Sequence, residues 1–435
     1  MAAMSYLNLV SFIGIFAFAA LAWLVGGCRR PVAWRTVLGS GGLMFVIAAL
    51  IFLLPATKQI LHGLNTLVVA ILTGSNRGGL FLFGPLAMGP GQATASGEPS
   101  VGFILATQVL PSIVFFASLM SVLYYFGVIQ WVVRWMAVGL QKTLGTSGAE
   151  TLSAAANVFV GQTEAPLVIR PYLADMTRSE LMALMVGGFA TVAGGVLAVY
   201  VGVYHIEAKH LLTASVISAP AALVVAKIMQ PEMEQPKTLG TVVIDAPSEA
   251  DNIVHAASMG AADGVKLAIN VGAMLIAFLA LIALINLIFA AMGSATAVTL
   301  DYLFGYEISS DWTLQGMLGY LFMPMAWLLG VESGDCLQVG QLLGIKMVAN
   351  EFLAYEQLHA ILPEGGTRQI SERSEMLATY ALCGFANFGS IGIQIGGIGP
   401  LAPKRKAELA QLGFRAMLGG TLAAFMTACI AGILL

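Results

Sequence analysis

Long apolar runs, separated by shorter polar connections, recur along the whole chain. Each run approaches the roughly 20 residues that an α-helix needs to cross the hydrocarbon core of a bilayer. The pattern therefore predicts an all-α polytopic membrane protein with eight membrane-spanning helices. We expect these spans near residues 5–27, 36–55, 101–127, 181–204, 211–229, 266–292, 375–396 and 412–434.

Several segments between the spans have a different character. Residues 56–76 and 129–145 are amphipathic, and the second segment carries two tryptophans, which favours helices lying in the membrane interface. Residues 84–99 are rich in glycine and proline. Residues 230–250 are polar and contain several prolines, so we expect a loop in solvent.

Two apolar regions are interrupted by polar residues. Residues 150–173 contain the sequence GQTEAP at 161–166, and residues 313–362 contain GVESGD and then VANEF. In transporters, apolar segments broken at corresponding places in two halves are the best sequence indication of a binding site. We therefore expect two hairpins that turn at membrane depth, with a binding site between their tips.

The interrupted regions belong to an internal repeat. The sequence Gly-Phe-Ala-Thr, ending at Thr191, matches Gly-Phe-Ala-Asn, ending at Asn387, and each follows a hairpin that carries a glutamate. Basic residues collect on cytoplasmic loops, and two basic clusters lie at 29–35 and 404–406. If both clusters lie inside, the connection at 170–178 also falls inside and the one at 368–375 falls outside. The two repeats are then inverted relative to each other.

Composition supports the membrane assignment and limits the function. Hydrophobic residues make up 58% of the 435 residues and charged residues only 10%, against about a quarter charged in soluble domains. A net charge of -3 with scattered basic residues gives no nucleic-acid footprint. The four cysteines have no disulfide or metal-ligand spacing. No phosphate-binding loop is present, which argues against an ATP-driven pump, and we expect no enzyme.

Glu164 and Glu351 are the candidate binding residues with the strongest physical argument. An ionised side chain at bilayer depth costs at least a few kcal/mol, so it needs a polar cavity or a partner. Gln162 and Thr163 stand beside Glu164 and add hydrogen-bonding groups. The alternatives are a hairpin tip in interfacial water, or ion pairs of Glu164 with Arg170 and of Glu351 with Lys346.

Polar residues near the two Gly-Phe-Ala sequences complete the candidate set. Asn387 and Ser390 are three residues apart, which predicts that they share one helix face, either for a ligand or for helix–helix hydrogen bonds. An unwound turn at Thr191 and Val192, with Asn157 and Val160 as partners, could offer oxygen atoms to a hard cation. The sequence YHIEAKH at 204–210 lies at the end of a span and indicates a solvated turn rather than a metal site.

Five stretches together resemble a known family. GQTEAPLVIRPYL, GGFATVAGGVLAVY, NVGAMLIAFLALIALIN, VANEFLAY and ALCGFANFGSIGIQIGGIGPLAPKR are similar to the bacterial concentrative nucleoside transporters, from about residue 75 onward. The resemblance implies a homotrimer in the bacterial inner membrane, with eight spans and two re-entrant hairpins in each protomer. It also implies a scaffold domain and a transport domain that carries a nucleoside elevator-fashion, coupled to sodium.

The resemblance also implies a role for individual residues. Those facing the nucleobase would be Gln162, Thr163, Glu164 and Val196. Those holding the ribose would be Glu351, Asn387 and Ser390, with Phe385 beside the site. The sodium ligands would be Asn157, Val160, Thr191 and Val192, mostly through backbone carbonyls. The family pattern has serine at the position of Thr191, and threonine keeps the hydroxyl group.

We expect the chain to divide along these lines. Residues 1–100, 101–148 and 231–312 would contribute spans and interfacial helices of the scaffold, whereas 149–230 and 313–435 would be the two repeats of the transport domain. Proton coupling is the alternative to sodium coupling. An intramembrane enzyme with Glu164 and Glu351 as an acid–base pair is an alternative of a different class. An amino-acid or dicarboxylate carrier is the alternative substrate class. Such a carrier needs positive donors for a carboxylate, but both hairpins carry glutamates.

Overall fold

The computed structural model describes residues 5–28, 32–54, 57, 59, 63, 66, 74–89, 93, 97–102, 104–108, 110–204, 206–239, 250–304, 312–362 and 368–435. These ranges contain helices and connections, and their only β-type pairings are two isolated bridges. The α-helices are α1 (Tyr6–Val25), α2 (Trp34–Leu53), α4 (Leu105–Gln108), α5 (Leu110–Tyr125), α6 (Val128–Leu144), α7 (Gly148–Ala156), α8 (Ala165–Val168), α9 (Arg178–Ala190), α10 (Gly194–Val203), α11 (Ala208–Met229), α12 (Ile253–Phe304), α13 (Leu314–Leu329), α14 (Cys336–Val348), α15 (Glu351–Ala360), α16 (Glu372–Leu382), α17 (Phe388–Ile398) and α18 (Lys406–Leu434). Short 3-10 helices are η1 (Gly84–Ala87), η2 (Arg170–Asp175) and η3 (Pro403–Arg405).

Six stretches in the described part of the chain are long and apolar enough to cross a membrane. They contain α1, α2, α4 with α5, α11, α12 and α18, and each overlaps a predicted span. The two remaining predicted spans, 181–204 and 375–396, are not continuous helices. The first is α9 and α10 with a break at 191–193, and the second is α16 and α17 with a break at 383–387.

The backbone explains why these two spans break. Thr191 ends α9 in an extended conformation, with φ -119° and ψ 164°. In the second repeat Gly384 has φ +108°, a left-handed conformation that favours glycine. Asn387 is again extended, with φ -140° and ψ 163°. Both predicted spans are therefore interrupted, in the first repeat at the turn that we expected to be unwound, and the chain leaves the helical conformation at each break before the next helix begins.

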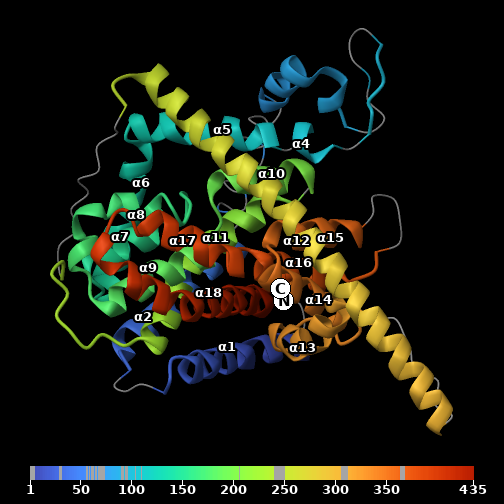
Figure 1. Cartoon of the computed structure of the whole chain (residues 1–435). Helices are drawn as coiled ribbons and strands as arrows, with labels where there is room; N and C mark the ends of the chain where they lie inside the picture. Colours follow the sequence, from blue (N-terminus) through green and yellow to red (C-terminus); the bar gives the residue numbers. More distant parts are fainter. Residues whose placement is uncertain are drawn as a thin grey trace.

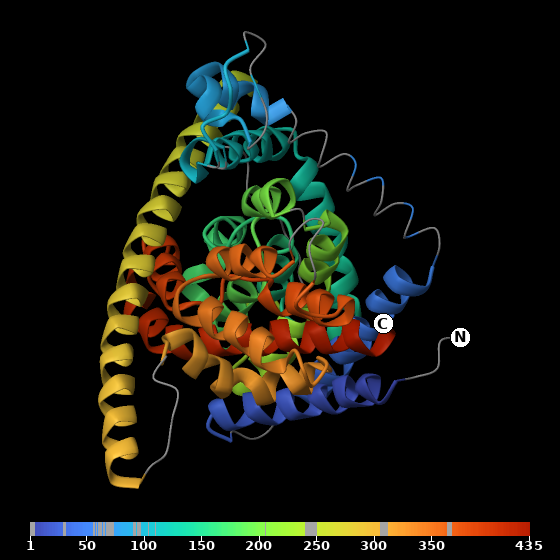
Figure 2. The same cartoon turned by 90° about the vertical axis from the view of Figure 1, so that its right-hand side faces the viewer.

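The helix α12 is longer than the span expected at 266–292. It has 52 residues and, at a rise of about 1.5 Å per residue, is roughly 78 Å long, more than twice the roughly 30 Å of a hydrocarbon core. It packs against α5 and runs along the outside of the bundle, as the long yellow helix in Figures 1 and 2. The span predicted at 266–292 is therefore only part of one helix, which extends beyond it at both ends.

The two repeats enter the bundle from opposite ends. At one end, the Arg405 guanidinium donates hydrogen bonds to the carbonyls of Ala174 and Met176, so the start of α18 lies beside the start of α9. At the other end, Arg373, near the start of α16, donates to Asn8 and to the Gly432 carbonyl. Since α9 and α16 begin at opposite ends, the prediction of inverted repeats is confirmed.

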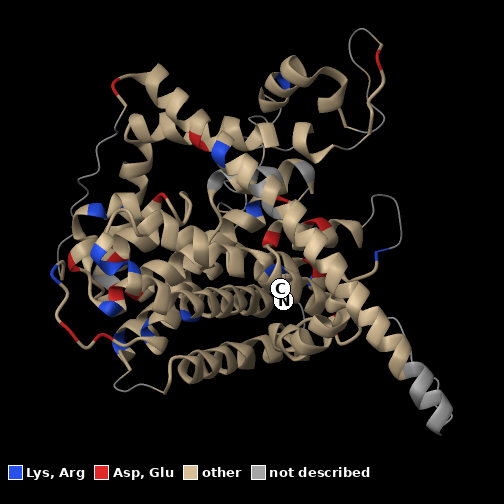
Figure 3. Ribbon diagram, in the orientation of Figure 1, with Lys and Arg blue, Asp and Glu red and all other residues tan. Residues whose placement is uncertain are grey.

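Polar contacts fix each hairpin to its end of the bundle. In the first repeat, Lys227 at the end of α11 forms an ion pair with Glu150 of α7, and both side chains are buried. In the second, Ser371 donates its backbone N–H to the Asp335 carboxylate at the start of α14 over 3.0 Å. A buried charge is tolerated when it is paired and hydrogen-bonded. Basic residues gather where α7, α8 and α9 lie (Figure 3), as positive loops on one side of a membrane would.

The predicted amphipathic segment at 129–145 is the helix α6. Val133, Ala137 and Leu144 are buried on one face, whereas Trp131 and Trp135 are exposed on the other. Most of the other predicted amphipathic segment, 56–76, lies outside the described residues. Arg29, Arg30 and residues 240–249 of the expected loop also lie outside them. The sequence YHIEAKH at 204–210 connects α10 to α11 and includes the first turn of α11. Its residue 205 lies outside the described residues.

Gly384 offers a test of the second break. A methyl group added there would lie 2.6 Å from the Phe189 carbonyl oxygen, in a left-handed conformation that alanine disfavours. We expect Gly384→Ala to lower the free energy of unfolding by about 2 kcal/mol, measured as thermal unfolding in detergent. The control is Gly392→Ala within α17, where an added methyl group meets nothing within 4 Å. Equal stability of the two variants would contradict this account of the break.

Candidate functional site

A cavity of about 100 Å³ lies between the tips of the two hairpins. The first hairpin is α7 and α8 with the tip between them, and the second is α14 and α15. The polar residues lining the cavity are Gln162, Thr163, Glu164, Asn350, Glu351, Asn387 and Ser390. Its apolar wall includes Ile113, Ala193, Val196, Leu267, Phe352, Phe385 and Ile393. The structure thus brings all eight predicted substrate residues to one cavity.

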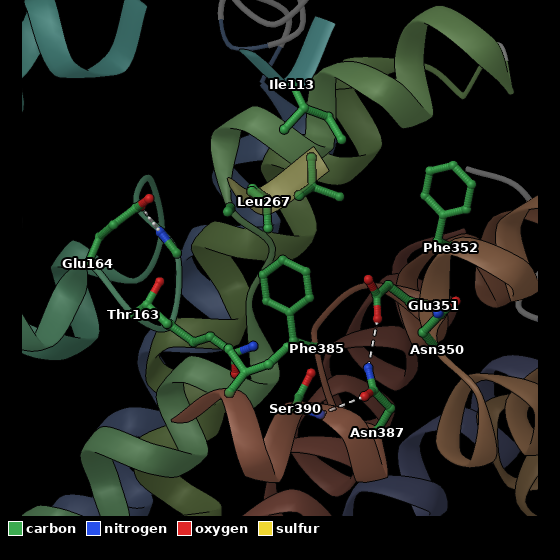
Figure 4. Close-up of a pocket in the computed structure, with 15 residues that line it drawn as sticks. Ile113, Thr163, Glu164, Leu267, Asn350, Glu351, Phe352, Phe385, Asn387 and Ser390 are labelled. Atoms are coloured by element: carbon green, nitrogen blue, oxygen red, sulfur yellow. Dashed lines mark hydrogen bonds between the residues drawn. The ribbon is translucent and has the colours of Figure 1, made fainter. Parts of the chain in front are cut away.

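The two glutamates enter this cavity from opposite hairpins. Figure 4 shows Glu164 on one side and Glu351 on the other, with the Phe385 ring between them. The Glu164 carboxylate accepts a hydrogen bond of 2.6 Å from the Gly161 backbone N–H of its own hairpin. This bond holds the side chain close to the tip.

Glu351 is held from two sides. The Tyr200 hydroxyl donates to its Oε1 and the Asn387 Nδ2 donates to its Oε2, each over 3.0 Å. Glu351 is 5% exposed. The expected alternative, an ion pair with Lys346, does not form, because the Lys346 ammonium donates instead to the carbonyls of Ala381 and Cys383. One carboxylate is therefore fixed by a phenol and an amide, with lone pairs left for a ligand.

Two helices begin at this carboxylate. The Asn350 side chain caps α15 by accepting from the Leu353 N–H, and the Asn387 side chain caps α17 by accepting from the Ser390 N–H, both over 2.9 Å. Asn387 therefore precedes its helix as the cap, and the prediction that it shares a helix face with Ser390 is wrong. Helix N-termini stabilise negative charge, so both caps favour a carboxylate at Glu351.

A second polar site adjoins the break between α9 and α10. Asn157 ends α7 and is 1% exposed. Its Nδ2 donates to the Ser153 carbonyl over 3.0 Å, whereas its Oδ1 has no hydrogen-bond partner within the described part of the chain. A buried oxygen without a donor has an unmet demand for one, which a cation would satisfy.

The other three predicted ion ligands surround the same place. The Thr191 hydroxyl donates to the Gly187 carbonyl over 2.9 Å, and a methyl group added at Gly187 would lie 3.3 Å from the Asn157 Nδ2. Val160 and Val192 are buried and precede Gly161 and Ala193, which are in close contact. The hairpin tip and the unwound segment 191–193 thus converge, and unwinding leaves carbonyls without a helical partner. Oxygen atoms of this kind suit a hard cation such as sodium.

Sequence reasoning missed several residues of the site. Tyr200 holds Glu351 from α10, but within an apolar run a tyrosine carries no distinguishing signal. Ile113 of α5 and Leu267 of α12 close the cavity from outside the repeats, and only the tertiary structure could place them there. Gln394 of α17 is not among the cavity-lining residues, but it donates to the Met185 carbonyl of α9 over 3.0 Å, close to the first break. It was detectable as a lone amide in a glycine-rich apolar helix.

The cavity can bind a neutral polar molecule with an apolar face. Among the described residues, the only charged ones that line it are the two glutamates, so this lining offers no cation to an anionic substrate. Carboxylates and amides pair with hydroxyl and amide donors, and the Phe385 ring offers a flat apolar surface.

Three matches to protein-family models identify the family of the chain. Residues 13–86 match the N-terminal part of Na+-dependent nucleoside transporters, 106–207 match a nucleoside-recognition domain, and 210–432 match the C-terminal part of the same transporters.

The chain belongs to the Na+-dependent nucleoside transporter family. This is a family of transporters and not of enzymes. An uncharacterized transporter of Haemophilus influenzae is 44% identical over 431 residues, covering 98% of this chain and 97% of the relative. Sodium/nucleoside cotransporter 1 of Mus musculus is 41% identical over 98% of this chain, which spans 64% of that relative's length. The chain thus spans about three fifths of the mammalian relatives it matches.

Solved structures agree on the fold. A structure of CNTnw in an inward-facing substrate-bound state has 41% sequence identity and a TM-score of 0.88, and the match covers 98% of both chains. A CNTnw variant in an outward-facing state has 40% identity and a TM-score of 0.89, covering 99% of this chain and 98% of the other. The all-α membrane fold is therefore confirmed.

Proposed function

We propose that the protein imports nucleosides across the bacterial inner membrane in symport with sodium. The observation that carries this proposal is the cavity between the hairpin tips, with carboxylates on two sides, a ring between them and a separate oxygen-rich place at the first break. The sodium/nucleoside cotransporters to which the chain is similar support both halves of the reaction.

The substrate would lie across the cavity with its two parts on different hairpins. A pyrimidine has an amide-like edge that an amide can complement, and the Gln162 Oε1 is buried without a hydrogen-bond partner in the described part of the chain. Gln162, Thr163, Glu164 and Val196 would therefore face the base. Vicinal ribose hydroxyls would donate to Glu351, whose charge strengthens these bonds, with Asn387, Ser390 and Phe385 close by.

Sodium would bind at Asn157, Val160, Thr191 and Val192 as a co-transported ion. The Asn157 Oδ1 lacks a donor, and this place adjoins the hairpin tip that carries Gln162 and Glu164. An ion that orders this tip would favour substrate binding, and by linkage the substrate would favour the ion. This reciprocity would couple the two movements.

Transport would proceed by an elevator-type movement of the repeats against a scaffold. The helices α5 and α12 pack on each other and contribute Ile113 and Leu267 to the cavity wall, so we assign them to the scaffold. The helices α1 and α2, expected in the scaffold, pack on α11 and α18 of the repeats, and we assign them to the moving part. Relatives solved in inward-facing, intermediate and outward-facing states support alternating access.

We propose a homotrimer, as the family resemblance implies. The helix α12 presents exposed apolar side chains, among them Ile276 and Leu287, which lipid or neighbouring copies would cover. The end of the bundle where basic residues gather, near α7, α8 and α9, would face the cytoplasm.

Competition for uptake tests the substrate class. Proteoliposomes with an inward sodium gradient should accumulate labelled uridine, and unlabelled nucleosides should compete. Uracil or ribose alone should compete weakly, because each meets only one side of the cavity. Amino acids and dicarboxylates should not compete. Accumulation blocked by a dicarboxylate but not by nucleosides would contradict the proposal.

Tyr200 gives a sharper test of the ribose side. Tyr200→Phe removes the donor to Glu351 and leaves the ring, and we expect the uridine concentration at half-maximal uptake to rise about tenfold. The control is Tyr204→Phe, four residues on, because the Tyr204 hydroxyl is buried without a hydrogen-bond partner in the described part of the chain. We expect that variant to take up uridine like the wild type. Equal effects of the two changes would show that the Tyr200 hydroxyl has no special part.

A further inference from the structure

Lys346 is a buried cation that the site described above does not use. It lies in the last turn of α14 and is 1% exposed. Its ammonium donates to the Ala381 carbonyl over 2.9 Å and to the Cys383 carbonyl over 3.2 Å. These contacts involve the last turn of α16, where the second repeat unwinds. Among the described residues no carboxylate forms an ion pair with it.

The repeat shows which position Lys346 occupies. The alignment that places Gly188 on Gly384 also places Gly187 on Cys383. In the first repeat, Gly187 is the residue against which the Asn157 amide lies and whose carbonyl accepts from Thr191. Asn157 and Lys346 both lie at the end of the first helix of their hairpin. Both side chains therefore reach the equivalent position of the following helix, the residue immediately before its Gly-Phe-Ala sequence.

The same alignment extends to the second carbonyl. Ala381 corresponds to Met185, whose carbonyl accepts from the Gln394 side chain over 3.0 Å. The first repeat thus satisfies these two carbonyls with neutral donors and leaves the Asn157 oxygen without one. The second repeat satisfies both carbonyls with one charged group. The two breaks lie at equivalent positions of the repeats, but only the second has a lysine that donates to its carbonyls.

We propose that the Lys346 ammonium is a tethered cation that holds the second break permanently, at carbonyls that the first repeat satisfies with neutral donors, so that only the first break depends on the transported sodium ion. The inference rests on the sodium site proposed above. The carbonyl end of a helix carries partial negative charge, and in a membrane interior it needs a partner. A lysine supplies a compact charge with three donors. Lys346 thus keeps the second break permanently occupied, while the first break is complete only when sodium binds.

This arrangement makes Lys346 a positioning residue for the ribose side. It holds the end of α16, after which the chain runs through Gly384 and Phe385 to Asn387, the donor to Glu351. A permanent cation would therefore keep Asn387 and Glu351 positioned for the ribose whether or not sodium is bound. Only the first repeat would then respond to sodium.

Two variants separate charge from packing. Lys346→Met keeps most of the side-chain volume without the charge, and Lys346→Ala removes both. We expect each to lower the apparent affinity for uridine about tenfold or more, since charge-assisted hydrogen bonds are lost. Ethylammonium, added at fixed sodium and pH, should restore uptake by Lys346→Ala, because it can enter the vacated space. It should not restore Lys346→Met, whose side chain fills that space, or Asn387→Ala, which is damaged elsewhere.

The outcomes distinguish this inference from the proposed function. Wild-type affinity in Lys346→Met would show that packing alone suffices and would overturn the inference. So would an assembled Lys346→Ala that does not respond to ethylammonium, and if that variant fails to assemble, Lys346→Met decides. Sodium coupling is tested separately, by wild-type uptake in choline. Loss of sodium dependence there would remove the proposed sodium site, whereas rescue by ethylammonium would still identify a cation place at Lys346.

Discussion

Glu351→Gln should reduce uridine uptake by at least about a hundredfold. The carboxylate accepts from Tyr200 on one oxygen and from Asn387 on the other, and it would accept the ribose hydroxyls as well. An amide has only one accepting oxygen, so its NH2 group would face a donor. Hydrogen bonds to charged groups contribute about 1.5–3 kcal/mol each, and two of them account for a hundredfold change.

The effect must come from the site and not from misfolding. Size-exclusion chromatography and thermal unfolding in detergent should give the same oligomer for Glu351→Gln as for the wild type. Glu356→Gln is the matched control, because Glu356 lies on the same helix, α15, and is exposed. It should transport normally. Normal transport by Glu351→Gln would show that the ribose is held elsewhere.

Asn157→Ala should weaken the response to sodium while the response to uridine at saturating sodium changes little. The side-chain oxygen is buried without a donor in the described part of the chain, and oxygen ligands are what a hard cation requires. Removing one ligand should raise the sodium concentration at half-maximal uptake about tenfold or more, equivalent to about 1.4 kcal/mol. The measurement is uridine uptake against sodium at constant ionic strength.

Asn270→Ala provides the comparison for this ion-site variant. Asn270 lies on α12 and is exposed, so its change should leave the sodium curve where it is in the wild type. Thr191→Val, which removes a hydroxyl from the same place as Asn157, should shift the curve in the same direction as Asn157→Ala. An unchanged sodium curve in both Asn157→Ala and Thr191→Val would place the ion elsewhere.

The features predicted from the sequence are those encoded by local pattern. Polar interruptions such as GQTEAP stand out against apolar surroundings, because a polar group at membrane depth costs free energy unless it has a polar partner. The repeat is visible because Gly-Phe-Ala recurs before a polar residue. Both lead directly to the cavity residues that the structure brings together.

Other features depend on contacts that no local pattern records. Asn387 has helix spacing to Ser390, yet it caps the helix because the chain turns at Gly384, whose conformation follows from packing against Phe189. Tyr200 is one aromatic residue among many, and its role depends on Glu351 reaching it from 151 positions away. The helix α12 extends beyond the span predicted at 266–292, because an apolar pattern marks where a span lies and not where a helix ends.

Replacing external sodium by choline tests the central proposal most directly. Wild-type protein in proteoliposomes, with the same pH on both sides, is given labelled uridine in sodium or in choline of equal concentration. We predict accumulation above the external uridine concentration in sodium and none beyond passive leakage in choline. Equal accumulation in choline, or accumulation driven only by an imposed proton gradient, would contradict sodium-coupled nucleoside import.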